Sequence, residues 1–106
     1  MNVGKQRRLK AAGWEFGTPP DFLGLTRDEA ILIETRLVLT DLVRRLRKRS
    51  GLTQGDLAKR LGSSQSRVAK VEAGDSSVSL DLIVRAAVAA GSKASDLARA
   101  MARVRP

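Results

Sequence analysis

Two residue types that carry much of protein chemistry are missing from this sequence, which contains no cysteine and no histidine. Disulfides, thiolate chemistry and histidine-based metal sites are therefore excluded. The side chain that normally changes charge between pH 5 and 8 is also absent. Carboxylates, serine and lysine remain for acid–base work, but no nucleophile motif accompanies them. We therefore expect neither an enzyme nor a bound metal or other cofactor.

Aromatic side chains are also scarce, at 3% of the chain, and all of them lie in its first quarter. The core elsewhere must be built from Leu, Val, Ile and Ala, which suits packed helices better than sheets. A length of 106 residues favours one domain with one modest core. The sequence thus predicts an all-α fold.

Acidic residues are fewer than basic ones: the chain has 11 Asp and Glu and 20 Lys and Arg, which gives a net charge of +9. This excess indicates a polyanionic partner such as nucleic acid, an acidic protein or an anionic membrane. No apolar run is long enough to span a bilayer, no signal-peptide pattern opens the chain, and the basic helix lacks aromatic interface anchors. We expect a cytoplasmic location without a membrane partner.

Glycine and proline concentrate in residues 1–25, which we interpret as an extended N-terminal arm before a helical domain at 26–106. The basic run KQRRLK, at 5–10, either contacts DNA or is an untethered terminus. The aromatic part of the arm either seals the domain's own core or docks on a toxin or a second subunit. The candidate partner-binding residues are Trp14, Phe16, Phe22 and Leu23.

A long helix is predicted at 27–49, with Thr26 and Glu29 forming a capping box and Gly51 ending it in a left-handed conformation. Its apolar stripe consists of Leu32, Leu39, Val43 and Leu46, flanked by Ile31, Val38 and Leu42. The basic run RRLRKR, at 44–49, spreads around this helix, so we expect a largely solvated face with Arg47 inside.

Four shorter helices should follow, which makes five in all and leaves no strand. Three of them are expected at 54–61, 65–73 and 80–90, each starting after a capping residue: Thr53, Ser64 and Ser79. Ser92 or Ser95 should open the last helix, which carries Leu97 and Met101.

The second and third of these helices are short and joined by a glycine-containing turn, which is the helix-turn-helix arrangement. Gly62 supplies the turn, and Val68 and Val71 anchor the later helix. The opposite face of that helix carries Gln65, Ser66, Ala69 and Lys70, with Arg67 at its edge.

The run GLTQGDLAKRLGSSQSRVAKVEAG, at 51–74, resembles the helix-turn-helix of the XRE family of Cro-like and phage-repressor DNA-binding proteins. The matching features are LTQ, DLA, LG, QS and VEAG in fixed order, followed by SLDLIVRAAVAAG at 79–91. The resemblance covers about 39–102. It implies a repressor-like fold and a sequence-specific regulator of transcription. A single motif reads few base pairs, so we expect a homodimer on a near-palindromic operator in double-stranded DNA.

The resemblance also implies roles for individual residues. Base contacts in the major groove are expected from Gln65, Ser66, Ala69 and Lys70, although a solvated polar face would look similar. Contacts to DNA phosphates are expected from Thr53, Gln54, Ser64 and Arg67, with Thr53 also acting as a simple helix cap. Arg47 and Glu72 should form a partly buried structural ion pair.

The preceding segment DFLGLTRDEAILIETRLVLT, at 21–40, is similar to the lead-in of HigA-type antitoxins. Those XRE proteins repress their own operon and neutralise a RelE-like toxin ribonuclease. This similarity implies an antitoxin of a type II toxin–antitoxin pair, with a toxin protein as a further partner. The alternative is a stand-alone phage-type repressor without a toxin partner.

Overall fold

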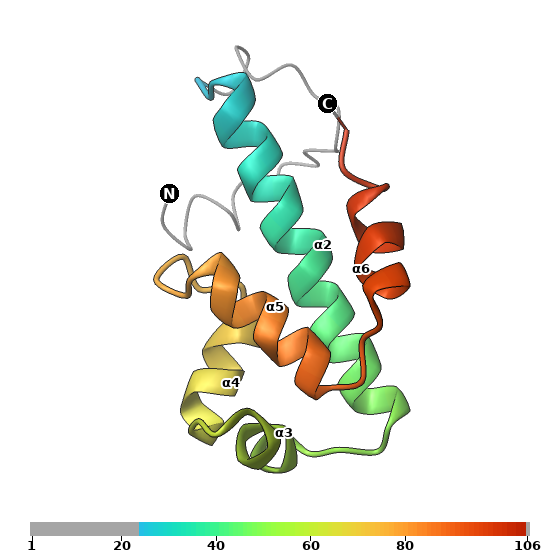
Figure 1. Ribbon diagram of the computed structural model, residues 1–106. Coiled ribbons are helices and arrows are strands. Elements are labelled where there is room, and N and C mark those ends of the chain that lie inside the picture. Colours follow the sequence, from blue (N-terminus) through green and yellow to red (C-terminus); the bar gives the residue numbers. More distant parts are fainter. Residues whose placement is uncertain (1–23, 106) are drawn as a thin grey trace.

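The structure is a computed structural model that describes residues 24–105. Within this range the chain forms helices only, which confirms the predicted all-α fold of five helices with a long first one (Figure 1). The helices are α2 (Arg27–Arg49), α3 (Gln54–Leu61), α4 (Gln65–Glu72), α5 (Leu80–Ala89) and α6 (Ala94–Met101). Most of the predicted N-terminal arm, including Trp14, Phe16, Phe22 and Leu23, lies outside the described residues.

Both ends of α2 follow the local signals in the sequence. The Thr26 hydroxyl accepts a hydrogen bond from the Glu29 amide at 3.1 Å, and the Glu29 carboxylate accepts one from the Thr26 amide at 3.2 Å. This reciprocal capping box satisfies amide donors that have no partner within the helix. At the other end Gly51 has a φ of 71°, a left-handed value that glycine adopts without a steric penalty. The predicted start and stop of this helix are therefore confirmed.

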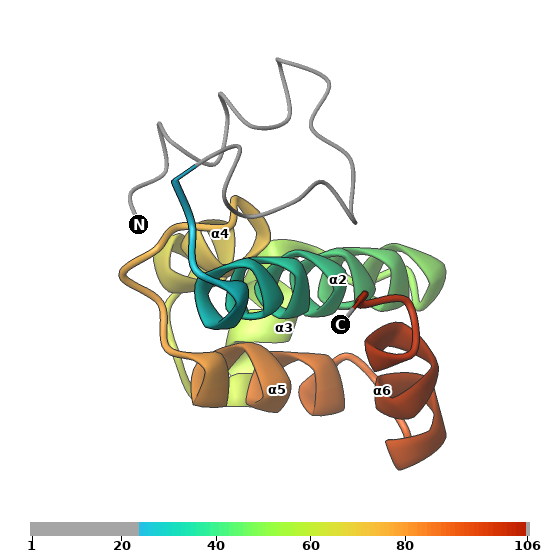
Figure 2. The same cartoon turned by 90° about the horizontal axis from the view of Figure 1, so that it is seen from above.

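Helix α2 is the scaffold against which the other elements pack. It contacts α4, α5 and α6, whereas α3 reaches the core through α4 and α5. Figures 1 and 2 both show α4 and α6 on opposite sides of α2. The two sides of the molecule can therefore be considered as separate surfaces.

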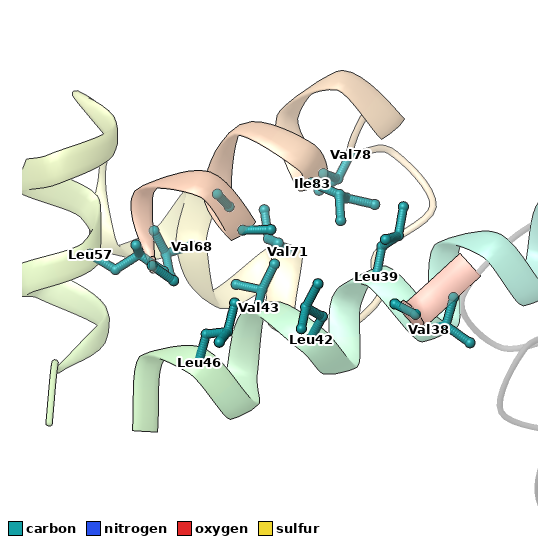
Figure 3. Close-up of a cluster of buried hydrophobic side chains, with 14 of the residues drawn as sticks. Val38, Leu39, Leu42, Val43, Leu46, Leu57, Val68, Val71, Val78 and Ile83 are labelled. Carbon is teal, nitrogen blue, oxygen red and sulfur yellow. The ribbon is translucent and has the colours of Figure 1, made fainter. Parts of the chain in front are cut away.

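The main core lies where α2, α3, α4 and α5 meet, and it consists entirely of aliphatic side chains (Figure 3). Leu57, Val43, Val68 and Val71 are completely inaccessible to solvent. Fully burying such a side chain contributes about 1.5–3 kcal/mol. The α3–α4 pair is thus packed against α2 and α5 through aliphatic side chains, the residue types that the composition predicted for the core.

The predicted apolar stripe of α2 is wrong at one position, because Leu32 is 50% exposed. The first turns of α2 extend past α5 (Figure 1). Ile33 points inward instead and forms a small second cluster with Leu25 and the half-buried Leu37. Leu25, which the sequence assigned to the arm, is therefore packed against the helical part of the chain.

The predicted start of the last helix is also wrong. Lys93, rather than Ser92 or Ser95, is the N-cap, and its amide donates to the Asp96 carboxylate at 2.8 Å. The Ser92 hydroxyl instead donates to the Lys93 carbonyl, so it does not cap the helix. Met101 is 39% exposed, and Ala100 is the residue that this helix buries.

An arginine of α2 fixes the loop between α4 and α5. The Arg36 guanidinium donates from Nη2 to the carbonyl oxygens of Asp75, at 3.0 Å, and Val78, at 2.5 Å. Val78 is buried in the core, so a polar contact and an apolar contact hold the same loop. This loop follows α4 directly, and its attachment to α2 therefore limits how α4 can move.

Candidate nucleic-acid interface

The turn between α3 and α4 is short because of a glycine and two helix caps. Gly62 ends α3 with a φ of 70°, and the next amide, that of Ser63, donates back to the Ala58 carbonyl at 2.9 Å. The Ser64 hydroxyl then accepts from the Arg67 amide at 3.2 Å and starts α4. Ala58 is 4% exposed, as expected where two helices approach closely.

The two faces of α4 differ sharply in burial. Val68 and Val71 point into the core and are completely buried. The opposite face carries the side chains predicted to read bases: Gln65, Ser66 and Lys70 are exposed and Ala69 is half-buried. These side chains occupy about two turns of α4, and the major groove of B-DNA is wide enough to admit an α-helix. The face is therefore open to a ligand within the described part of the chain.

A line of polar contacts runs from this face into the protein. The Gln65 side-chain amide donates to Gln54 Oε1 at 2.8 Å, and the Gln54 amide donates to Glu72 Oε1 at 3.3 Å. Gln54 thus bonds with protein groups at both ends of its amide, and its predicted phosphate contact stays a prediction. Its position limits the directions in which Gln65 can point.

This line ends in an ion pair between α2 and the last residue of α4. Arg47 donates to the Glu72 carboxylate from Nε at 2.5 Å and from Nη2 at 2.9 Å. Its Nη1 donates to the Leu52 carbonyl at 2.9 Å. The two side chains are 13% and 6% exposed, so water screens the pair poorly. The structure therefore brings together the two residues predicted to pair.

The ionisation of both partners reflects this contact. The hydrogen bond to Glu72 raises the pKa of Arg47 above its ordinary value, although burial opposes the shift. Burial alone would raise the pKa of Glu72, but the hydrogen bonds from Arg47 and Gln54 outweigh it and leave the pKa below its usual range. The pair therefore remains fully charged at neutral pH.

The N-terminal ends of α3 and α4 differ as sites for a phosphate. In α3 the Asp56 carboxylate accepts the Thr53 amide at 3.0 Å, while the Thr53 hydroxyl accepts the Asp56 amide at 3.0 Å. Hydrogen bonding from Thr53 to the carboxylate, above all from the Thr53 backbone amide, lowers the pKa of Asp56, so a negative charge already occupies this end. The first turn of α4 has no acidic residue, and Arg67 is exposed there. Ser64 and Arg67 thus have the more favourable setting for an anion.

Sequence reasoning missed two residues that position this interface. Asp56 lies three residues after Thr53, a spacing that signals a capping box and could have been found. Arg36 lies 39 residues before Asp75, whose carbonyl it contacts, and no local pattern marks it. Contacts between helices distant in sequence require the tertiary arrangement.

The geometry of α3 and α4 defines a helix-turn-helix protein, and comparison with known families agrees. The family described as "Helix-turn-helix domain" matches residues 38–100, and the chain belongs to this family. It is thus a DNA-binding protein of the XRE-like helix-turn-helix class, the class to which many transcriptional regulators belong. No curated protein and no solved structure matches the chain.

Between residues 24 and 105, no helix is both long and apolar enough to cross a membrane. The same range contains no group of three or more acidic side chains arranged to hold a metal ion.

Proposed function

We propose that this protein regulates transcription by binding a specific DNA sequence, with α4 inserted in the major groove. The observation that carries the proposal is the division of α4 into two faces. Val68, Val71 and Glu72 hold one face to the protein, whereas Gln65 and Lys70 project from the other into solvent. A helix presented in this way can approach base edges without any rearrangement of the core.

Each exposed side chain has a matching base chemistry. The Gln65 amide can accept from and donate to the edge of adenine, and its bond to Gln54 restricts its orientation in advance. Lys70 can donate to the acceptors of guanine, and the Ala69 methyl group can contact the methyl group of thymine. Ser66 adds a hydroxyl that can donate or accept.

Phosphate contacts supply much of the affinity in this proposal. Ser64 and Arg67 lie at the N-terminal end of α4, where the helix dipole also favours an anion. Thr53 and Gln54 would contact a phosphate at the start of α3. The net charge of +9 strengthens attraction to DNA, so affinity should fall steeply as salt concentration rises.

A homodimer completes the proposal, because one α4 helix contacts only a few base pairs. Two copies related by a twofold axis would bind two half-sites about 34 Å apart on one face of the duplex. The operator would then be near-palindromic, and the half-site spacing would report the geometry of the dimer.

Selection of bound DNA from a random pool at fixed salt tests this proposal, and fluorescence anisotropy then measures affinity. The double variant Gln65→Ala/Ser66→Ala should bind the selected operator at least about tenfold more weakly while keeping its affinity for unrelated DNA. Ser95→Ala, a change at an exposed serine of α6, is the matched control and should bind as wild type does. Equal operator affinity of the double variant and wild type would refute readout by α4.

A toxin–antitoxin role is a second candidate, favoured by the sequence of the lead-in to α2 and by one exposed residue there. Leu32 is 50% exposed on the first turns of α2, where a protein partner could cover it. In this role the protein represses its own operon and neutralises a RelE-like toxin, with Trp14, Phe16, Phe22 and Leu23 as contact residues.

Deletion of residues 1–23 tests that role, because it leaves buried Leu25 and the cap residue Thr26 in place. The truncated protein should fail to neutralise a ribonuclease encoded beside it but should bind the operator normally. Equal loss of both activities would contradict this division of roles. The absence of any such ribonuclease gene would favour a stand-alone repressor.

A further inference from the structure

A cleft of about 560 Å³ lies between α2 and α6. Helix α6 lies on the side of α2 away from α4 (Figures 1 and 2). Its size falls within the range of known ligand sites. Buried apolar side chains of Leu42, Leu46 and Ala100 form its floor. None of the residues predicted to contact DNA lines it.

Four arginines line the walls of this cleft, two from each side. Arg45 and Arg49 stand one turn apart on α2, and Arg99 and Arg103 stand one turn apart on α6 and the turn that follows it. The side chains of Arg45, Arg99 and Arg103 are 55%, 76% and 58% exposed. Their guanidinium groups therefore remain accessible from solvent.

The arginines form two groups, each with one carboxylate. At one end Asp41 accepts from Arg45 at 2.8 Å and lies 4.0 Å from Arg103. At the other end the Asp96 carboxylate accepts a hydrogen bond from Arg99 at 2.8 Å. Hydrogen bonds to its carboxylate lower the pKa of Asp96, and the positive charge of Arg49 is close enough to help lower it. Each end thus has two arginines for one carboxylate and an excess of one positive charge.

The spacing of these two ends is set by α2, because Arg45 and Arg49 are four residues apart. At 1.5 Å per residue the backbone positions of Arg45 and Arg49 lie about 6 Å apart along the cleft. Two carboxylates on successive turns of a helix have a similar separation, and an apolar residue between them would lie over Leu42 and Leu46. Arginine is well suited to hold such carboxylates because its planar group donates two parallel hydrogen bonds.

We infer that the α2–α6 cleft binds an acidic segment of a partner protein, with two carboxylates about one helical turn apart on either side of an apolar side chain. The openness of the arginine walls favours a protein segment over a small organic anion, which needs an enclosing site. The position of the cleft away from α4 separates it from the proposed DNA contacts. This inference does not rest on the proposed function.

The test uses the full chain and a fluorescein-labelled helical peptide that carries two glutamates four residues apart with leucine between them. Binding is followed by fluorescence anisotropy at fixed salt. The double variants Arg49→Gln/Arg99→Gln and Arg45→Gln/Arg103→Gln remove the positive charge at either end. Each should weaken binding at least about tenfold, since charge-assisted hydrogen bonds are lost.

Arg85→Gln is the matched control, because Arg85 pairs with Asp81 at 3.2 Å in the same spacing but lies on the solvent-exposed face of α5, away from the cleft lining. This variant should bind the peptide as wild type does, and a peptide with glutamine in place of both glutamates should not bind. Circular dichroism establishes that every variant is folded. Operator affinity of the cleft variants is measured in parallel, so failure of this inference and failure of the DNA proposal are distinguishable.

Three results would overturn the inference. Equal weakening by Arg85→Gln would show attraction to net charge alone. Full competition by duplex DNA would place the peptide on a nucleic-acid surface. Binding of free glutarate as tight as that of the peptide would indicate a site for a small anion rather than a protein segment.

Discussion

Replacement of Glu72 by glutamine should be among the most destabilising conservative changes in this protein. The variant leaves the Arg47 guanidinium, 13% exposed, with the Leu52 carbonyl and a neutral amide in place of a carboxylate. Breaking a buried pair by removing one partner costs about 3–5 kcal/mol. The partial exposure of Arg47 and its contact to Leu52 place the expected loss near the lower limit, at about 3 kcal/mol.

Urea unfolding at pH 7, followed by circular dichroism, measures this loss. A loss of about 3 kcal/mol corresponds to a fall in melting temperature of about 12–24 °C for a domain of this size. Arg45→Gln is the control, because its pair with Asp41 is exposed and should contribute no more than about 1 kcal/mol. A loss below about 1 kcal/mol in Glu72→Gln would refute the reasoning, since the pair would then behave like a surface contact.

The stability difference between wild type and Glu72→Gln should also depend on pH. The folded pKa of Glu72 lies below its usual value of 4.5, so the carboxylate contributes stability above that pH. This contribution disappears as the pH falls from about 4.5 through the folded pKa. The difference in unfolding free energy between wild type and Glu72→Gln should therefore be constant near neutrality and shrink in acid. A difference that stays constant down to pH 2 would contradict the assignment.

Three further changes test the interior, the turn and the interface. Leu57→Ala removes a completely buried side chain and should cost about 2–5 kcal/mol in urea unfolding, whereas a cost below about 1 kcal/mol would contradict the described core. Gly62→Ala places a methyl group in open space but at a φ of 70°, so it should lower the free energy of unfolding by about 1 kcal/mol. Gly62→Asn should lower it less, and equal stability of wild type and both variants would argue against a left-handed turn. Gln54→Ala frees the Gln65 amide and should weaken operator binding about tenfold in an anisotropy titration, while equal affinity would show that Gln54 does not orient Gln65.

Local signals predicted the helices well, because their ends depend on neighbouring residues. The Thr26–Glu29 box, Ser64, and the left-handed glycines at 51 and 62 are readable from short patterns. The predicted start of the last helix was less accurate. The Asp96 carboxylate accepts the backbone amide of the cap residue Lys93, and a search for serine caps overlooks this arrangement.

The hydrophobic periodicity of the sequence could not predict features that depend on how the helices are placed relative to one another. Leu32 and Leu39 lie seven residues apart on the predicted stripe, yet Leu32 is 50% exposed and Leu39 is 3% exposed. The contact of Arg36 with the loop after α4 is of the same kind. For the α3–α4 face, the motif predicted which side chains face outward, whereas the link from Gln65 through Gln54 to Glu72 required coordinates.

The two faces of α4 do not share residues, and this has a consequence for redesign. The positions that attach the helix are 68, 71 and 72, and the positions proposed to read bases are 65, 66, 69 and 70. Solvent-facing substitutions away from packed or capped positions usually change stability by no more than about 0.5 kcal/mol. A library randomised at the three exposed positions, 65, 66 and 70, should therefore yield mostly folded proteins, from which variants with new operator preferences could be selected on an unchanged scaffold.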